Sequence, residues 1–274
     1  MKKCLLILLS ALLGLACSRE NQEEVEPRLV VEGWIESGGA PVVLVTTSVT
    51  PSRELQAVSS LTDNVERWAR VKISDGENEV FLTGYISGRY FPPYYYTTGR
   101  MLGETGKTYK ITVDSNGRHA EAYATIPPPQ QILRLDPVPY GDEGGLYLLK
   151  ATVPGGEHYK FFTLIEGTDK SYVPAITSLA EGTGSETEIT IRPGNSLNRE
   201  EKRPAFRSGE KVYVKCCTME DGIYRMWETL DNLIYLDTTA FFTLDTNLPG
   251  NVDGAIGYFA GYGKAEYKIT IPGQ

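Results

Sequence analysis

Cysteine and histidine are scarce in this chain of 274 residues, with 4 and 2 copies respectively. Zinc sites in proteins are built from clusters or spaced pairs of these residues, and neither an HExxH nor a CxxC pattern occurs. His119 and His158 stand apart, each in a strand-like segment. A Ser/His/Asp site assembled in space stays open, although no GxSxG nucleophile motif is present. We expect no catalytic residues, no metal and no cofactor.

A disulfide framework is missing as well. Cys4 and Cys17 belong to the N-terminal segment, which leaves the neighbours Cys216 and Cys217 in "EKVYVKCCTME". Adjacent residues of a strand point to opposite faces, so an ordinary disulfide between them is awkward. A strained vicinal disulfide is one alternative. The other is two free thiols, with Cys216 continuing the apolar face of Val212. In either state the hydrophobic core has to supply the stability.

Basic residues are outnumbered, and the apolar runs are short. The formal net charge is −8 and no basic stripe offsets it, so we expect no binding to nucleic acid. The apolar run over residues 5–16 follows Lys2 and Lys3. A helix of this length reaches roughly 18 Å, well short of the ~30 Å hydrocarbon core of a bilayer. Residues 1–16 are therefore predicted to be a signal peptide rather than a membrane span.

The chain changes character at Cys17. The preceding "LGLA" resembles the lipobox of bacterial lipoproteins, with Gly14 where a leucine is usual. The resemblance implies cleavage before Cys17 and its acylation; the alternative is an ordinary secretory signal. Residues 17–27 are then an acidic tether, which charge repulsion keeps extended. "SRENQEE" also resembles the signal that sends Bacteroidetes lipoproteins to the outer face of the outer membrane. We expect a lipid-anchored protein of the outer membrane that faces the cell exterior.

From residue 28 onward the apolar pattern has a period of two, which is typical of strands. Strand pairs are predicted within residues 28–48, 68–84 and 107–127. We expect an N-terminal immunoglobulin-like antiparallel β-sandwich over residues 28–126. The three prolines of "PPPQQ", residues 127–131, remove backbone donors and stiffen the chain, so this stretch is predicted to be a linker.

A second β-rich domain is predicted over residues 132–274. Its period changes once, because apolar residues recur at helical spacing over residues 219–236, from Ile223 to Trp227 and beyond. Thr218 and Asp221 form a candidate capping box for this amphipathic helix. Strands are predicted at "GLYLLKATV", "HYKFFTLIEG", "ETEITIRPG", "EKVYVKCC" and "AEYKITIPG". Residues 168–209 are dense in proline and glycine, and except around Ile189 we expect long surface loops there.

The segment "RYFPPYYYTTGR", residues 89–100, combines five aromatic residues with two prolines. Aromatic faces bind sugar rings, ligand rings and protein partners at a low cost in side-chain entropy. One interpretation makes this segment a binding loop; the other lets the tyrosines cover the edge of the sandwich. The candidate binding residues are Tyr90, Phe91, Tyr94, Tyr95 and Tyr96.

Two further motifs resemble ligand sites without meeting their requirements. "GETGKTY", residues 103–109, lacks the first glycine of a phosphate-binding P-loop, where Met101 stands instead. "DTNLPGNVDG", residues 245–254, is rich in oxygen ligands, but Pro249 and Ile256 occupy two positions that an EF-hand calcium loop needs. We interpret both motifs as turns.

The order of several short motifs resembles the DUF4249 family of Bacteroidetes lipoproteins. These motifs are "LVVEGWI", "ARVKISDG", "GETGKTYKITV", "AEAYATIPPP", "EDGIYRMWETL" and "NLPGNVDGAIGYFAG". Such proteins are commonly encoded beside a TonB-dependent receptor, which implies that receptor as a partner. The family supplies no catalytic residues to carry over. We interpret its most characteristic motif as structural, with the residues Gly250, Asn251, Gly257, Tyr258 and Phe259.

The expected function is therefore that of a non-catalytic accessory binding subunit in TonB-dependent nutrient uptake. Its expected contacts are the membrane, through a lipid on Cys17, the receptor, and a small nutrient, glycan or peptide ligand. One alternative is a structural or adhesion lipoprotein of the cell envelope. Another is a hydrolase that acts on envelope polymers.

Overall fold

The computed structural model describes residues 26–48, 62, 64–142, 144–182, 184–194, 203–235 and 249–273. The predicted signal peptide, Cys17 and the tether up to residue 25 lie outside the described residues. Within them the protein is mainly β, with three sheets and one helix, which confirms the mainly β prediction. None of the described helices is long and apolar enough to cross a bilayer.

The largest sheet has eight strands and extends through the whole molecule. In spatial order these strands are β12 (Val173–Glu181), β11 (His158–Ile165), β15 (Lys211–Met219), β17 (Ile256–Thr270), β1 (Leu29–Glu36), β2 (Val42–Thr47), β6 (Tyr94–Thr97) and β5 (Thr83–Ile86).

Two smaller sheets cover one face of the large sheet. The five-stranded sheet has the order β16 (Val252–Asp253), β8 (Arg118–Thr125), β7 (Thr108–Ser115), β3 (Arg70–Ser74) and β4 (Glu79–Phe81). The four-stranded sheet contains β13 (Glu186–Ile191), β10 (Leu146–Pro154), β14 (Phe206–Arg207) and β9 (Arg134–Pro139).

Two lobes result from this arrangement. The N-terminal lobe consists of the five-stranded sheet, β1, β2, β5, β6 and the first half of β17. The C-terminal lobe consists of the four-stranded sheet, β11, β12, β15, the second half of β17 and the helix α2 (Asp221–Tyr235). Each lobe has its own apolar core between two sheets. A third core, around α2, lies on the opposite face of the large sheet.

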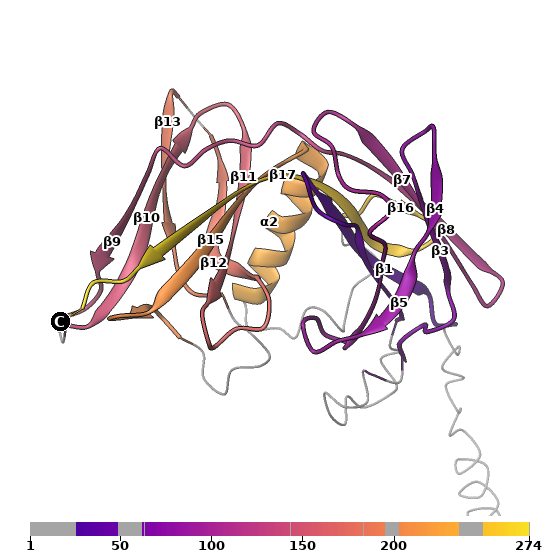
Figure 1. The fold of residues 1–274 in the computed structure, drawn as a ribbon, viewed down its shortest axis with the longest axis horizontal. Helices are drawn as coiled ribbons and strands as arrows, with labels where there is room; N and C mark the ends of the chain where they lie inside the picture. Colours follow the sequence, from indigo (N-terminus) through magenta and orange to yellow (C-terminus); the bar gives the residue numbers. More distant parts are fainter. Residues whose placement is uncertain are drawn as a thin grey trace, which may run out of the picture.

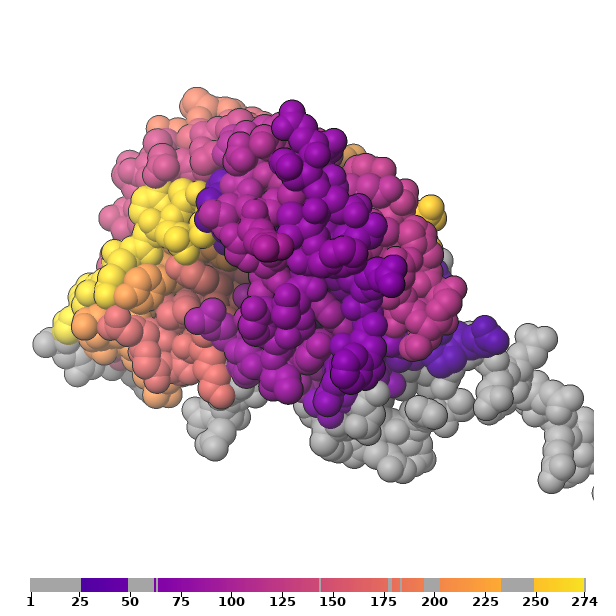
Figure 2. Space-filling view, turned by 45° about the vertical axis from the view of Figure 1, so that its right-hand side comes forward, coloured from indigo at the N-terminus to yellow at the C-terminus, as the bar shows by residue number. Residues whose placement is uncertain are grey.

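Strand β17 belongs to both lobes. Its first half pairs in parallel with β1, so that Ala260 lies beside Trp34, and its second half pairs with β15, so that Ala265 lies beside Cys216. Figure 1 shows this yellow strand passing from one lobe to the other, with α2 next to it. In Figure 2 the violet surface of the N-terminal lobe directly adjoins the yellow and orange surface of the C-terminal strands.

Glycines allow the chain to approach β17 closely. Gly257 has a φ of +124°, and a Cβ there would lie 1.9 Å from the carbonyl oxygen of Val31. A Cβ on Gly261 would lie 2.1 Å from the carbonyl oxygen of Thr125. The predicted linker at 127–131 begins directly after this contact, and the Thr218 hydroxyl of β15 donates to the carbonyl of Pro128 at 2.8 Å. Strand pairing thus joins residues on both sides of the predicted domain boundary, which itself stays a prediction.

The three predicted hairpins are present. Strand β1 pairs with β2, β3 with β4, and β7 with β8. In the last hairpin Asn116 and Gly117 both have positive φ, which is the turn geometry that an Asn-Gly pair favours. The prediction of loops in residues 168–209 is wrong for β12, because Val173–Glu181 pairs with β11. Pairing with the preceding strand β11 here overrides a local pattern that Pro174 interrupts. The strand predicted around Ile189 is confirmed as β13, because Glu186–Ile191 pairs with β10.

The predicted helix is present as α2. Its apolar face is buried in the third core through Ile223, Met226, Trp227 and Leu230. The predicted capping box is wrong, because Thr218 ends up in β15 and its hydroxyl donates to two backbone carbonyls, those of Pro128 and Gly263. The first turn instead closes on the carbonyl of Glu220, which accepts from the amides of Ile223 and Tyr224.

Candidate functional site

The aromatic segment at residues 89–100 is partly a strand. Tyr94, Tyr95 and Tyr96 lie in β6, so their side chains alternate between the two faces of the large sheet. Tyr96 points into the N-terminal core and is 3 % exposed. Its hydroxyl donates to the carbonyl of Glu66 at 2.6 Å and accepts from the amide of Ala69 at 3.0 Å. Burial raises the pKa of Tyr96 well above its ordinary value. Tyr96 therefore has a packing role.

Tyr94 lies on the same face as Tyr96, with ring centroids 5.4 Å apart. Its hydroxyl donates to the carbonyl of Arg67 at 3.0 Å. The ring also covers Gly84 of β5, where a Cβ would lie 1.9 Å from the Tyr94 hydroxyl oxygen. Tyr94 thus closes the edge of the sandwich between β5 and the segment before β3.

The opposite face carries a row of four rings that we call the aromatic row: Trp34, Tyr85, Tyr90 and Tyr95. The Tyr90 ring meets Trp34 edge-on at 5.3 Å and Tyr95 at 5.0 Å, and Tyr95 meets Tyr85 at 6.2 Å. Tyr85 is 50 % exposed and the other three are half-buried. Phe91, also half-buried, follows directly in the chain. Of the predicted binding residues, Tyr90 and Tyr95 therefore share one partly exposed aromatic surface.

An ion pair on this same face links the lobes. Lys215 of β15 donates to the carboxylate of Glu36 at the end of β1, and the Lys264 ammonium of β17 lies 3.3 Å from the other carboxylate oxygen. The Lys215 side chain is 9 % exposed and that of Glu36 is 13 % exposed. A charge so deeply placed is costly unless it is paired. The pair therefore ties β15 to β1 across the intervening β17.

Aromatic rings surround the Lys215 ammonium. It lies 4.9 Å from the ring centroid of Phe162 and 4.7 Å from that of Tyr172. The loop that carries Tyr90 reaches across to this place, and the Ser171 hydroxyl donates to the carbonyl of Arg89 at 2.5 Å. We call Glu36, Phe162, Tyr172, Lys215 and Lys264 the interlobe cluster. The aromatic row and the interlobe cluster are continuous.

The charges of the cluster are set by their surroundings. Burial acts to lower the pKa of Lys215, but Cys217 and Glu36 oppose it, so that the pKa of Lys215 is raised. Burial also places the pKa of the Cys217 thiol far above its usual range, so that this thiol is neutral near pH 7. The Glu36 carboxylate is then the group that keeps Lys215 charged. Burial raises the pKa of Tyr90 as well, and Lys215 opposes that shift.

Two more polar contacts stabilise the third core. Lys160 of β11 is fully buried, donates to Asp231 of α2 at 2.6 Å and lies 5.0 Å from the ring centroid of Trp227. Burial lowers the pKa of Lys160, and Asp231 opposes that shift. On β1, Glu32 accepts a 2.8 Å hydrogen bond from the Tyr258 hydroxyl. Desolvation raises the pKa of Glu32 above its ordinary value.

The residues of the characteristic C-terminal motif lie on both sides of β16, with Gly250 and Asn251 before it and Gly257, Tyr258 and Phe259 at the start of β17. The Asn251 side chain accepts from the amide of Phe259 at 2.8 Å and donates to its carbonyl at 2.8 Å. It also donates to the carbonyl of Tyr123 at 2.9 Å. Phe259 is fully buried in the N-terminal core, and Tyr258 is buried in the third core. A Cβ on Gly250 would lie 2.1 Å from the carbonyl oxygen of Gly257.

The residues that the sequence offered for catalysis are dispersed. His119 pairs with Asp114 at 2.7 Å on the surface of the five-stranded sheet. His158 stacks on Tyr224, with ring centroids 4.4 Å apart, and lies 3.5 Å from Asp221. In the described residues neither imidazole is hydrogen-bonded to a hydroxyl or a thiol. Cys216 and Cys217 are free and buried, on opposite faces of β15, and burial raises the pKa of Cys216 to about 12.

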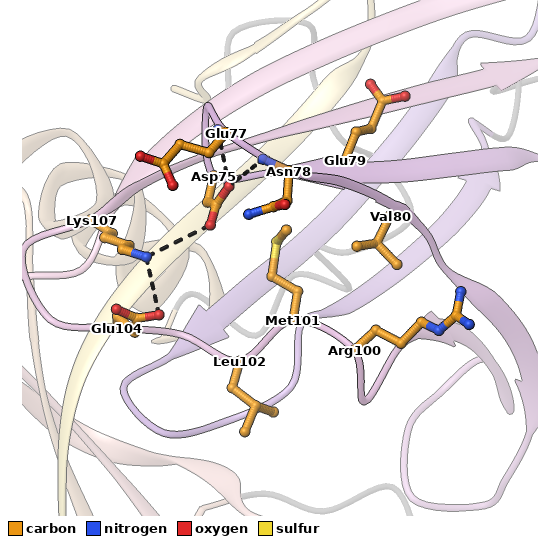
Figure 3. Close-up of a pocket in the computed structure, with 10 residues that line it drawn as sticks. All are labelled: Asp75, Glu77, Asn78, Glu79, Val80, Arg100, Met101, Leu102, Glu104 and Lys107. Carbon is orange, nitrogen blue, oxygen red and sulfur yellow. Dashed lines mark hydrogen bonds and ion pairs between the residues drawn. The ribbon is translucent and has the colours of Figure 1, made fainter.

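A shallow depression of about 430 Å³ lies beside the "GETGKTY" turn. Figure 3 shows the Lys107 ammonium between two carboxylates, 3.1 Å from Glu104 and 3.7 Å from Asp75. The backbone amides of Asn78 and Glu77 donate to the Asp75 carboxylate, and the hydrogen bond from Asn78 does most to lower the pKa of Asp75. Lys107 is therefore already paired with two carboxylates, whose negative charges disfavour the binding of a phosphate in this depression.

Metal ligands do not gather in the described part of the chain, where no group of three or more His, Cys, Asp or Glu side chains could hold an ion. Of the calcium-like motif, Asn251 is committed to backbone groups, while Asp245 and Asn247 lie outside the described residues.

The fold and this surface define a two-lobed β protein whose most distinctive feature is a half-exposed aromatic row beside paired charges. The chain belongs to the family described as "Domain of unknown function (DUF4249)", whose match covers residues 19–268. This confirms the resemblance seen in the sequence. No curated protein matches the chain.

Sequence reasoning missed Trp34, Glu36 and Lys215. In an alternating strand, the positions between core residues normally face solvent, and all three occupy such positions. These residues are covered only because β17 joins the two lobes and so places β1 and β15 on either side of it in the large sheet. The one local signal was a tryptophan between two glutamates in "EGWIE", an unusual composition for a solvent-facing row.

Proposed function

We propose that the protein is a non-catalytic lipoprotein of the outer membrane, anchored through Cys17 and facing the cell exterior. In this proposal it acts as an accessory binding subunit in TonB-dependent nutrient uptake. Membership of the family supports it, together with the lipobox-like sequence and the acidic residues after Cys17.

The aromatic row is the observation that supports binding most directly. Three rings on strands of the large sheet, those of Trp34, Tyr85 and Tyr95, are joined by Tyr90 from the loop before β6, and Tyr85 is half exposed at the rim. Rings held on strands lose little entropy when a ligand arrives, and they suit sugar rings and peptide side chains. The ligand class proposed is a small nutrient, a glycan or a peptide.

The proposed mechanism is capture without chemistry. A binding module on a short tether raises the effective concentration of its ligand near the mouth of a receptor in the same membrane. The immunoglobulin-like character of residues 28–126 is part of this proposal, as the module that presents the row. It is supported by the two β-sheets that enclose one apolar core there.

The test compares two tyrosines of the aromatic row with an exposed tyrosine of the five-stranded sheet. Tyr85→Ala with Tyr95→Ala should abolish recovery of a TonB-dependent receptor, or of bound nutrient, from mildly solubilised membranes. Tyr123→Ala is the matched control, because Tyr123 is 55 % exposed on the five-stranded sheet, away from the row. Tyr96→Ala is unsuitable, since loss of a buried ring destabilises the fold.

Recovery of neither receptor nor ligand with the unmodified protein would contradict the uptake proposal and favour a structural or adhesion role. Equal losses with the row variant and with Tyr123→Ala would contradict the assignment of binding to the row.

A further inference from the structure

One end of the N-terminal lobe lies close to the predicted lipid. Only residues 18–27 separate Cys17 from the fold, and ten residues span at most about 35 Å when fully extended. If Cys17 is acylated, as the proposed function requires, the end of the lobe that carries Pro27 stays near the membrane surface.

The structure identifies the residues at this end. Arg118, the first residue of β8, donates to the carbonyl of Pro27 at 2.8 Å and to the Glu66 carboxylate at 2.9 Å. Strand β3 starts here too, because Arg70 pairs with Asp114 just before that turn. The segment 66–70 therefore lies beside the point where the tether enters the fold.

Strand β5 ends at the same place. Leu29, the first residue of β1, pairs with Thr47, the last residue of β2. Strand β6 begins on this side of the sheet, and its first residue, Tyr94, pairs with Ile86, the last residue of β5. Tyr94 connects the two segments, since it pairs with Ile86 through its backbone and its hydroxyl binds the carbonyl of Arg67. In Figure 1 the arrowhead of β5 lies at the lower end of the N-terminal lobe.

This end exposes two large apolar side chains. Trp68 is 95 % exposed and Ile86 is 78 % exposed, among the highest values of the large apolar residues described. Tryptophan concentrates at the boundary between lipid and water, where its ring and its N–H are both accommodated. Two such side chains next to a short tether fit a bilayer surface better than bulk solvent.

Three arginines surround them in a chain whose net charge is −8. Arg28, Arg67 and Arg70 are exposed, and none of them forms an ion pair within the described residues. By contrast, the neighbouring Arg118 is paired with Glu66. Arginines that have no acidic partner among the described residues, beside an apolar pair, match the anionic headgroups of a lipid surface.

We infer that Arg28, Arg67, Trp68, Arg70 and Ile86 form a membrane-facing patch that docks on anionic lipid headgroups and fixes the orientation of the lobes. Stable attachment to membranes generally needs two signals, and the patch is the second one beside the lipid. Docking through this end directs the opposite end of the sheet away from the bilayer.

The test uses the chain from residue 18 onward, which carries no lipid and retains every described contact of the fold. Vesicles of phosphatidylcholine alone are compared with vesicles of equal parts phosphatidylcholine and phosphatidylglycerol. The unmodified chain should sediment with the anionic vesicles only. Emission from Trp68 should shift to the blue, while Trp227 is buried and Trp34 half-buried. Raising salt from about 50 mM to about 500 mM should release it.

Trp68→Ser with Ile86→Ser should weaken this binding at least about ten-fold, and each of Arg67→Ala and Arg70→Ala about five-fold. The matched control is Leu102→Ser with Arg100→Ala. Leu102 is 50 % exposed and precedes Gly103, which bridges to Ser37 at the far end of β1. This control should bind vesicles as the unmodified chain does. All variants should have the same midpoint of thermal unfolding as the unmodified chain.

Three results would overturn the inference: no binding of the unmodified chain to anionic vesicles, an equal loss in the control, or loss of a protein partner by the Trp68 variant without loss of vesicle binding. Acylation is measured separately, by incorporation of an alkyne-labelled fatty acid at Cys17 in cells. A failed proposal of lipid anchoring is thereby distinguished from a failed patch.

Discussion

The ammonium of Lys215 and the carboxylate of Glu36 form a nearly buried ion pair between residues 179 positions apart in the chain. Their strands, β15 and β1, flank β17 on either side. Because each lobe contributes one partner, the pair and β17 together couple the lobes. This coupling leads to an asymmetric prediction.

Glu36→Gln should destabilise the protein by about 3 kcal/mol or more, because it leaves Lys215 without an anion in a nearly buried site. Lys215→Met should cost less, about 1–2 kcal/mol, because Glu36 keeps Lys264 as a partner. Urea unfolding measures both losses. Glu79→Gln, which breaks the more exposed pair with Lys72, should leave the urea midpoint nearly unchanged. A larger loss for Lys215→Met would contradict the proposed order.

Gly257→Ala should prevent stable folding. The methyl group would overlap the Val31 carbonyl and strain a backbone at φ +124°, so that the parallel pairing of β17 with β1 could not form. Yield of monodisperse protein and its far-UV circular dichroism report the outcome. Gly99→Ala is the control, since nothing lies within 4 Å of a Cβ there. A well-folded Gly257→Ala protein would show that β17 can shift its register.

Asn251→Ala should destabilise the fold by about 2 kcal/mol. It removes three hydrogen bonds to the backbone of Phe259 and Tyr123, each worth about 0.5–1.5 kcal/mol, in a site that water partly reaches. Thermal unfolding measures the loss. Asp253→Ala, two residues further on, should have little effect. If both variants behaved alike, the Asn251 contacts would carry no specific stability.

The pH dependence of stability should include a contribution from Glu32. Desolvation raises its pKa in the folded protein above the ordinary value of 4.5, so the folded state binds more protons than the unfolded state between these two values. Stability from this group is fully present below about pH 4.5 and is lost as the pH rises through the raised pKa.

Glu32→Gln should therefore stabilise the protein near neutral pH and flatten this part of the profile, while Tyr258 keeps a hydrogen-bond acceptor. Urea midpoints between about pH 4 and pH 8 provide the measurement. A variant that is less stable than the unmodified protein at pH 7 would show that the Glu32 charge is favoured in the fold.

Much of the secondary structure could be predicted from the sequence, because hairpins and amphipathic helices are local. Asn116-Gly117 specifies its turn within a few residues, and the helical spacing of Ile223, Met226 and Trp227 specifies α2. Strands β5, β6 and β12 were not predicted. Strands β5 and β6 have only four residues each, and the pairing of β12 with β11 shifts register, so none of them shows a sustained local period of two.

The candidate site was predicted in part. The aromatic segment was found from composition, but composition does not tell which tyrosine faces the core. Alternation in β6 buries Tyr96 and leaves Tyr95 in the aromatic row, and the phase of that alternation depends on the pairing of β6 with β2.

The sequence by itself determined the mainly β character, the three hairpins, the helix and the family, since all of these depend on residues that are close in the chain or on the order of short motifs. Only the tertiary structure decided that β17 joins both lobes and that Glu36, Lys215 and the aromatic row share one face. The reason is physical: an alternating strand has two equivalent faces until a remote strand pairs with it, and pairing across more than two hundred residues leaves no trace in the local pattern.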